Sequence, residues 1–136
     1  MVSRLAMLDH IGIDVSDLER SKAFYRAALA PLGYEVIKDV PQRSAAGFGV
    51  RAGHGKSTDP AGDFWIVQGP PAPSVHVAFN AARRADVDAF YRAAVAAGGR
   101  DNGTPGLRPR YHANYYGAFV LDPDGYNVEA VCHAAE

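Results

Sequence analysis

The amino-acid sequence contains one stretch twice. Segments 10–33 and 76–99, laid over each other without a gap at an offset of 66 residues, share nine identical positions. The identities include an unbroken Ala-Phe-Tyr-Arg-Ala-Ala block and a histidine at the start of each segment, His10 and His76. Only two such copies fit into 136 residues. The chain is therefore expected to be a tandem duplication of one supersecondary unit rather than a solenoid.

Each copy begins with a strand followed by a helix. The apolar residues alternate in DHIGIDV and again in VHVAFN, as in a strand with one buried face. The first helix is predicted to begin at Ser16, which forms a capping box with Glu19, and to stop at Gly33. The second is predicted over about 86–97, where Ala82 replaces the capping serine.

Shorter strand-like runs follow each helix. In the first half they are GYEVIKDV, AGFGVRA and DFWIVQG; in the second, NYYGAFVL and YNVEAVCH. The stretch RDNGTPGLRPRYHA is predicted to be mostly loop, because Gly and Pro interrupt it. The predicted fold class is α+β: one domain, 1–136, of two tandem β-α-β-β-β modules, about 5–69 and about 72–134. Their sheets are expected to curl into an open barrel-like cup.

The last strand raises a question of charge, because Glu129 lies in its middle. Alternation puts Val128, Ala130 and Cys132 on the apolar face, and Glu129 on the opposite one. His10 and His76 likewise lie opposite the apolar faces of their strands. Two imidazoles and one carboxylate that converge inside a cup suit a divalent cation. The alternatives are hydrogen-bonded core histidines and an ion pair between Glu129 and an arginine. Cys132 is expected in the core, and the Asp-Pro-Asp-Gly turn is expected to connect a hairpin rather than bind calcium.

Composition narrows the class of protein. A formal net charge of -1 without a dense Lys/Arg run argues against a nucleic-acid partner. The single cysteine excludes an intrachain disulfide framework and suits a reducing compartment. No signal peptide or apolar stretch of membrane-spanning length is apparent. A cytoplasmic domain is expected.

These motifs resemble the vicinal oxygen chelate superfamily, which includes glyoxalase I, bleomycin-resistance proteins, extradiol dioxygenases and fosfomycin-resistance thiol transferases. The resemblance rests on LDHIGIDVSDLERSKAFYRAALAPLGYEV, VHVAFNAARRADVDAFYRAAVAAGG and YYGAFVLDPDGYNVEAV, and covers nearly the whole chain. It implies two modules that form a cup around a divalent ion (Fe, Mn, Zn or Ni). It maps the metal ligands onto His10, His76 and Glu129, and gives Glu129 a catalytic role.

The chain departs from glyoxalase I at the fourth ligand. Matching apolar-X-apolar cores puts Trp65 at that position, whereas the rigid offset gives Asp63. With Trp65 there, three protein ligands remain, as in extradiol dioxygenases and fosfomycin transferases. The pocket wall is expected to include Phe48, Trp65 and Phe119. Tyr115 is favoured over Tyr116 as a substrate hydrogen-bond donor, and His112 is a candidate acid or base.

The resemblance implies a metal-dependent lyase, isomerase, dioxygenase or transferase acting on a small substrate that chelates the ion through oxygen. The alternative is a metal-free protein that sequesters a planar ligand, as bleomycin-resistance proteins do. The unpaired sheet edge expected in each module predicts a homodimer.

Overall fold

The computed structural model describes residues 7–53 and 55–136 and contains the same unit twice. The first module comprises β1 (Ile11–Val15), α1 (Leu18–Leu29), the 3-10 turn η1 (Ala30–Leu32), β2 (Glu35–Val40), the 3-10 turn η2 (Pro41–Arg43), β3 (Ala45–Gly49) and β4 (Phe64–Gln68). The second comprises β5 (His76–Asn80), α2 (Arg84–Ala96), β6 (Arg100–Leu107), β7 (Tyr116–Leu121) and β8 (Asn127–Cys132). The tandem β-α-β-β-β prediction is confirmed.

Each module forms one four-stranded sheet, in the order β1-β4-β3-β2 and β5-β8-β7-β6. The first and last strands of each module pair in parallel, and the other neighbours pair antiparallel. The described residues form two separate sheets and no closed barrel. The strands that carry the motif histidines, β1 and β5, are both sheet edges.

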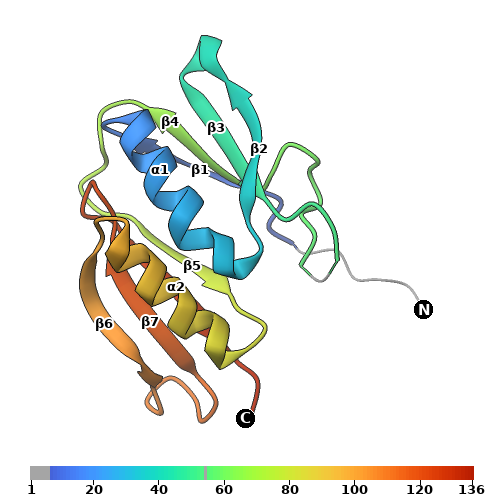
Figure 1. The fold of residues 1–136 in the computed structure, drawn as a ribbon, viewed down its shortest axis with the longest axis vertical. Coiled ribbons are helices and arrows are strands. Elements are labelled where there is room, and N and C mark those ends of the chain that lie inside the picture. Colours follow the sequence, from blue (N-terminus) through green and yellow to red (C-terminus); the bar gives the residue numbers. More distant parts are fainter. Residues whose placement is uncertain (1–6, 54) are drawn as a thin grey trace.

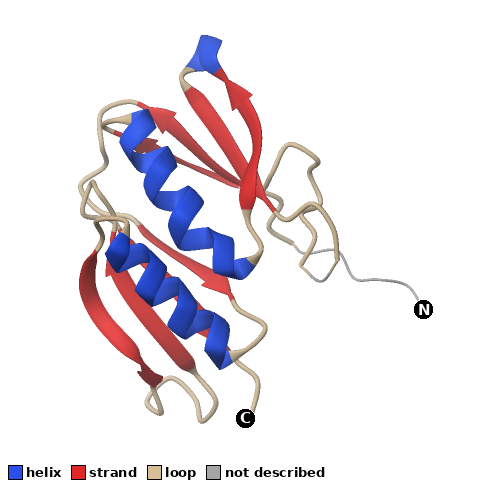
Figure 2. Ribbon diagram, viewed as in Figure 1, coloured by secondary structure: helices blue, strands red, loops and turns tan. Residues whose placement is uncertain are grey.

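Both helices lie on the same side of the molecule, each covering its own sheet (Figures 1 and 2). Their apolar faces join the two sheets into one continuous core. The contact between modules is aromatic: the Phe79 ring of β5 lies 5.2 Å from the Phe64 ring of β4 and 5.2 Å from the Tyr34 ring. The opposite sheet faces remain open, since Gly12, Asp14 and His76 are exposed there.

A polar clasp also ties the modules together. The hydroxyl of Tyr25, in α1, donates a hydrogen bond to buried Asp122, which also accepts from the backbone N–H groups of Asp124 and Tyr126. Burial raises the pKa of Asp122 and, with the nearby Asp122 charge, raises that of Tyr25. The Tyr126 hydroxyl donates to the Asp14 carbonyl at the end of β1. The Asp-Pro-Asp-Gly turn therefore joins the modules as well as connecting β7 to β8.

Three local predictions differ from the structure. The N-cap of α1 is Asp17, whose side chain accepts from the Arg20 N–H at 3.1 Å; Ser16 instead donates its hydroxyl hydrogen to Asp124. The stretch expected to be mostly loop contains β6, which pairs with β7. Gly103 and Gly106 stand where the register shifts, and Gly is tolerated at such bulges. The second helix begins at Arg84, two residues before the predicted start.

No helix among residues 7–53 and 55–136 is long and apolar enough to cross a membrane.

Candidate functional site

Glu129 lies on the sheet face opposite α2, as alternation predicted, and is only 2% exposed. One of its carboxylate oxygens is 3.1 Å from Nε2 of His76. The other accepts a hydrogen bond from the Tyr115 hydroxyl. We call the surrounding cavity, of about 560 Å³, the Glu129 pocket; it is lined by His76, Tyr111, His112, Tyr115, Phe119, Asn127 and Glu129.

The choice between the two adjacent tyrosines is visible in the structure. Tyr115 faces Glu129, whereas the hydroxyl of Tyr116 bonds Asp88 of α2 at 2.6 Å, on the other side of the sheet. Burial and the hydrogen bond to Glu129 raise the Tyr115 pKa well above its usual value. Tyr115 therefore remains an O–H donor at neutral pH. Beside it, the rings of Phe119 and His76 stack at 6.3 Å.

The histidines predicted as ligands have their Nδ1 atoms occupied. Nδ1 of His76 faces the Asn127 carbonyl oxygen at 3.2 Å, and this oxygen can only accept. Nδ1 of His10 bonds the Asp9 carboxylate at 2.7 Å, a contact that raises the pKa of His10. Each Nδ1 therefore carries a hydrogen, and Nε2 is the nitrogen available to bind a cation.

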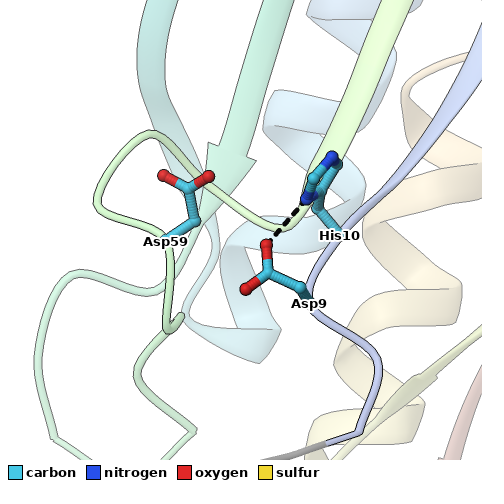
Figure 3. A group of neighbouring side chains, drawn as sticks. All are labelled: Asp9, His10 and Asp59. Atoms are coloured by element: carbon cyan, nitrogen blue, oxygen red, sulfur yellow. Dashed lines mark hydrogen bonds and ion pairs between the residues drawn. The ribbon is translucent and has the colours of Figure 1, made fainter.

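His10 does not line the Glu129 pocket. It borders a different cavity, of about 820 Å³, whose lining includes residues 77–82 and Ala134 but neither His76 nor Glu129. Figure 3 shows its neighbours, Asp9 from the same segment and Asp59 from the loop before β4. These three residues offer ligand atoms within 4.8 Å of one another. Within the described part of one chain, His10, His76 and Glu129 do not form such a group.

His112 lines the Glu129 pocket but has no free ring nitrogen. Its Nδ1 accepts the Asn114 backbone N–H at 3.2 Å, so its hydrogen is on Nε2, which lies 2.8 Å from Nδ1 of His133. His133 accepts this hydrogen and carries its own on Nε2. The Tyr115 ring makes T-shaped contacts with both imidazoles. His133 was not among the predicted site residues; it follows β8 and borders the cavity that contains His10.

The strand registers locate the first-module counterpart of Glu129. Glu129 pairs with Ala78, and the equivalent position on β1, Gly12, pairs with Trp65. The counterpart is therefore Trp65 rather than Asp63, which instead accepts from the Ser57 hydroxyl at 2.8 Å. Trp65 is half-buried and lines neither cavity described above.

Phe48 does not form a pocket wall. It is completely buried on the helix-facing side of β3, where its ring meets Tyr25 and Phe64. Burying an aromatic ring of this size in the core is strongly favourable, and no part of it is left for a ligand. Phe119, by contrast, is among the residues that line the Glu129 pocket.

Known proteins support the same fold. The family model described as Glyoxalase/Bleomycin resistance protein/Dioxygenase superfamily matches residues 7–130. A glyoxalase/bleomycin resistance protein from Albidiferax ferrireducens T118 is 30% identical, with a TM-score of 0.75 over 95% of this chain and 100% of that one. A glyoxalase-related enzyme from Fulvimarina pelagi has a TM-score of 0.67 at 18% identity, over 94% and 88%.

The E144Q mutant of glyoxalase I from Zea mays is 28% identical, with a TM-score of 0.63 over 91% of this chain but only 46% of the maize chain. The chain thus spans about half of that enzyme. No curated protein sequence matches significantly. Since the family model covers nearly the whole duplicated unit, the chain belongs to the glyoxalase/bleomycin resistance protein/dioxygenase superfamily.

Proposed function

We propose that the protein is a divalent-metal-dependent enzyme of the glyoxalase/dioxygenase type, acting on a small organic substrate that chelates the ion through oxygen. His76 and Glu129 of one chain hold the ion, and His10 of a second copy is the third ligand. The observation that carries this proposal is the buried carboxylate of Glu129, 2% exposed and 3.1 Å from His76 Nε2. With Nδ1–H of His76 directed at the Asn127 carbonyl, the Nε2 atom and the Glu129 oxygen face each other, so a proton or a metal ion between them is needed, and we propose the metal ion.

The donor set fits a metal. Imidazole and carboxylate together suit the borderline divalent ions Fe, Mn, Zn and Ni. Both histidines have Nδ1 held by an acceptor, which is the usual arrangement of a metal-bound imidazole. The group formed by Asp9, His10 and Asp59 is the weaker candidate, because its side chains are exposed or half-exposed and water already solvates their charges.

A second copy is invoked because one chain does not gather the three ligands. The edge strands β1 and β5 leave backbone groups unpaired, and the sheet faces that bear His10 and His76 are open. In a twofold dimer the first module of each chain can meet the second module of the other, which gives two equivalent sites. Such a dimer keeps the ligand set predicted from the sequence.

The chemistry follows from the residues around the ion. A bound divalent ion supplies a Lewis acid that polarises a substrate oxygen. The Tyr115 hydroxyl keeps its proton and donates it to Glu129; once an ion offsets the Glu129 charge, the same hydroxyl is placed to turn and donate to an oxygen of the substrate. Phe119 offers a flat apolar wall. Both ring nitrogens of His112 are engaged, so as an acid or base it would exchange its proton with His133, its Nε2 partner.

A mixing experiment tests the shared site. His10→Ala and Glu129→Gln are each prepared without a histidine tag, and Mn²⁺ binding is measured by calorimetry. Each variant alone should lose at least tenfold in affinity, about 1.4 kcal/mol. Co-expressed, the two should form mixed dimers in which one of the two sites has all its native ligands. About a quarter of the wild-type high-affinity sites should then return.

The outcomes separate the alternatives. If the variants bind no Mn²⁺ when mixed although light scattering shows dimers, the site does not combine the two chains. If light scattering shows a monomer at micromolar concentration, His10 of a second copy cannot be the third ligand. If the wild type binds none of the four divalent ions, the metal-dependent enzyme is abandoned for the metal-free sequestering protein.

A further inference from the structure

The connection from β6 into β7 carries positive charge and contains no acidic residue. Between Asn102 and Leu121 the sequence contains two arginines and one histidine but no aspartate or glutamate. The chain as a whole has a formal net charge of -1. This segment therefore differs in sign from the rest of the molecule, and it forms one side of the Glu129 pocket.

Both arginines lie against rings that line this pocket. The guanidinium of Arg108 lies 5.4 Å from the centre of the Phe119 ring, and that of Arg110 lies 5.2 Å from the centre of the Tyr111 ring. Both arginines thus lie beside the lining residues of the pocket rather than among them. Among the residues that the structure describes, neither guanidinium has a carboxylate within 4.0 Å. Arg108 also donates to the carbonyl oxygens of Gly106 and Thr104, which fix its position.

The pocket has little negative charge to balance them. Glu129 is the one acidic residue in its lining, and both its oxygens already face partners, His76 and Tyr115. A divalent ion bound there would more than offset its single charge. Guanidinium groups present planar, paired N–H donors that match carboxylate and phosphate oxygens. Arg108 already donates from both terminal nitrogens to Gly106 and Thr104, so it contributes its charge, and Arg110 is the one placed to donate.

We infer that the Glu129 pocket selects a small planar organic anion, with Arg108 and Arg110 attracting its carboxylate or phosphate group and the rings of Phe119 and Tyr111 contacting its body. This inference rests on the proposed function and names its substrate class. The neutral diols and carbonyl compounds that could also chelate the ion would be disfavoured, because they gain nothing from the two guanidinium charges.

The test compares two probes of similar shape at pH 7, salicylate and uncharged salicylamide, by calorimetric titration of the Mn²⁺-loaded protein. Salicylate should bind at least tenfold more tightly. Arg110→Gln should weaken salicylate binding about fivefold, about 1 kcal/mol, and leave salicylamide unchanged. Arg108→Gln should act in the same direction. The control is Arg92→Gln, an exposed arginine of α2, which should change neither affinity.

Three results would overturn the inference. They are equal affinity for the two probes, no measurable salicylate binding, and an equal loss of salicylate and salicylamide affinity in Arg110→Gln. Mn²⁺ titration of Arg110→Gln is recorded in parallel, and its affinity should match the wild type. If the wild type binds no Mn²⁺, the proposed function fails and the titrations are repeated on metal-free protein. If metal-free protein still prefers salicylate and loses this preference in Arg110→Gln, the anion site is supported. If metal-free protein shows no preference for salicylate, the inference is overturned.

Discussion

Tyr115→Phe tests whether the tyrosine hydroxyl and a cation compete for Glu129. The substitution removes the donor to one oxygen of a carboxylate that is 2% exposed. Leaving a buried acceptor without its partner costs about 1–3 kcal/mol of folding stability. For a domain of this size each kcal/mol corresponds to about 3–5 °C in Tm. The metal-free variant should therefore melt about 3–15 °C below the wild type.

Saturating Mn²⁺ should reduce this difference, because the ion then offsets the charge that the hydroxyl had stabilised. Because folding and binding are thermodynamically linked, any stability that Mn²⁺ restores to the variant must appear as tighter Mn²⁺ binding by the variant. If the cost falls by about 1 kcal/mol, Tyr115→Phe should bind Mn²⁺ about fivefold more tightly than the wild type. The assay is thermal unfolding with chelator and with Mn²⁺, followed by calorimetric titration of the metal.

Tyr116→Phe provides the matched control, since its hydroxyl bonds Asp88 on the opposite side of the sheet. That variant should lose the same stability with and without Mn²⁺, and its metal affinity should not change. The reasoning is refuted if Mn²⁺ leaves the Tm deficit of Tyr115→Phe as large as before. In that case the Tyr115 hydroxyl and the cation do not share Glu129.

Three other substitutions test different parts of the structure. Gly47→Ala would place a Cβ 2.8 Å from the Trp65 ring, so we expect a loss of about 1–3 kcal/mol and altered tryptophan fluorescence; an unchanged Tm would contradict this. Burial raises the pKa of Asp122 on folding, so this carboxyl lowers the stability of the wild type as pH rises from about 4, and Asp122→Asn lacks this contribution. The Tm of Asp122→Asn minus that of the wild type should increase between pH 4 and 6, and a constant difference would remove Asp122 as the cause. Asp59→Asn should leave Mn²⁺ affinity within about twofold, while Glu129→Gln lowers it at least tenfold; the reverse order would place the ion at the exposed group.

Strand periodicity accounts for most of what the sequence predicted correctly. Successive side chains in a strand point to opposite faces, so one buried residue fixes the orientation of its neighbours. That rule placed Glu129 in the pocket and Cys132 in the core, and it separated Tyr115 from Tyr116. The tandem repeat then supplied the order of elements, because each copy must bury its helix against its own sheet.

Predictions failed where tertiary context decided the outcome. Gly and Pro in β6 looked like breakers, but at bulges of an edge strand they are tolerated. Phe48 satisfies the composition of a pocket wall and of a core equally well, and only the packing of Tyr25 and Phe64 around it decides. The separation of His10 from His76 depends on how the two modules meet, which no local pattern encodes.

The aromatic contact between the modules has a consequence for cutting the chain. Phe79 of the second half lies against Phe64 and Tyr34 of the first, so a fragment ending in the 69–75 linker would expose an apolar surface that only the other fragment covers. Two such fragments, made as separate polypeptides, should recognise each other and rebuild the interior. The linker would then be dispensable as a covalent bond, and the protein could serve as a split reporter whose assembly follows the proximity of its halves.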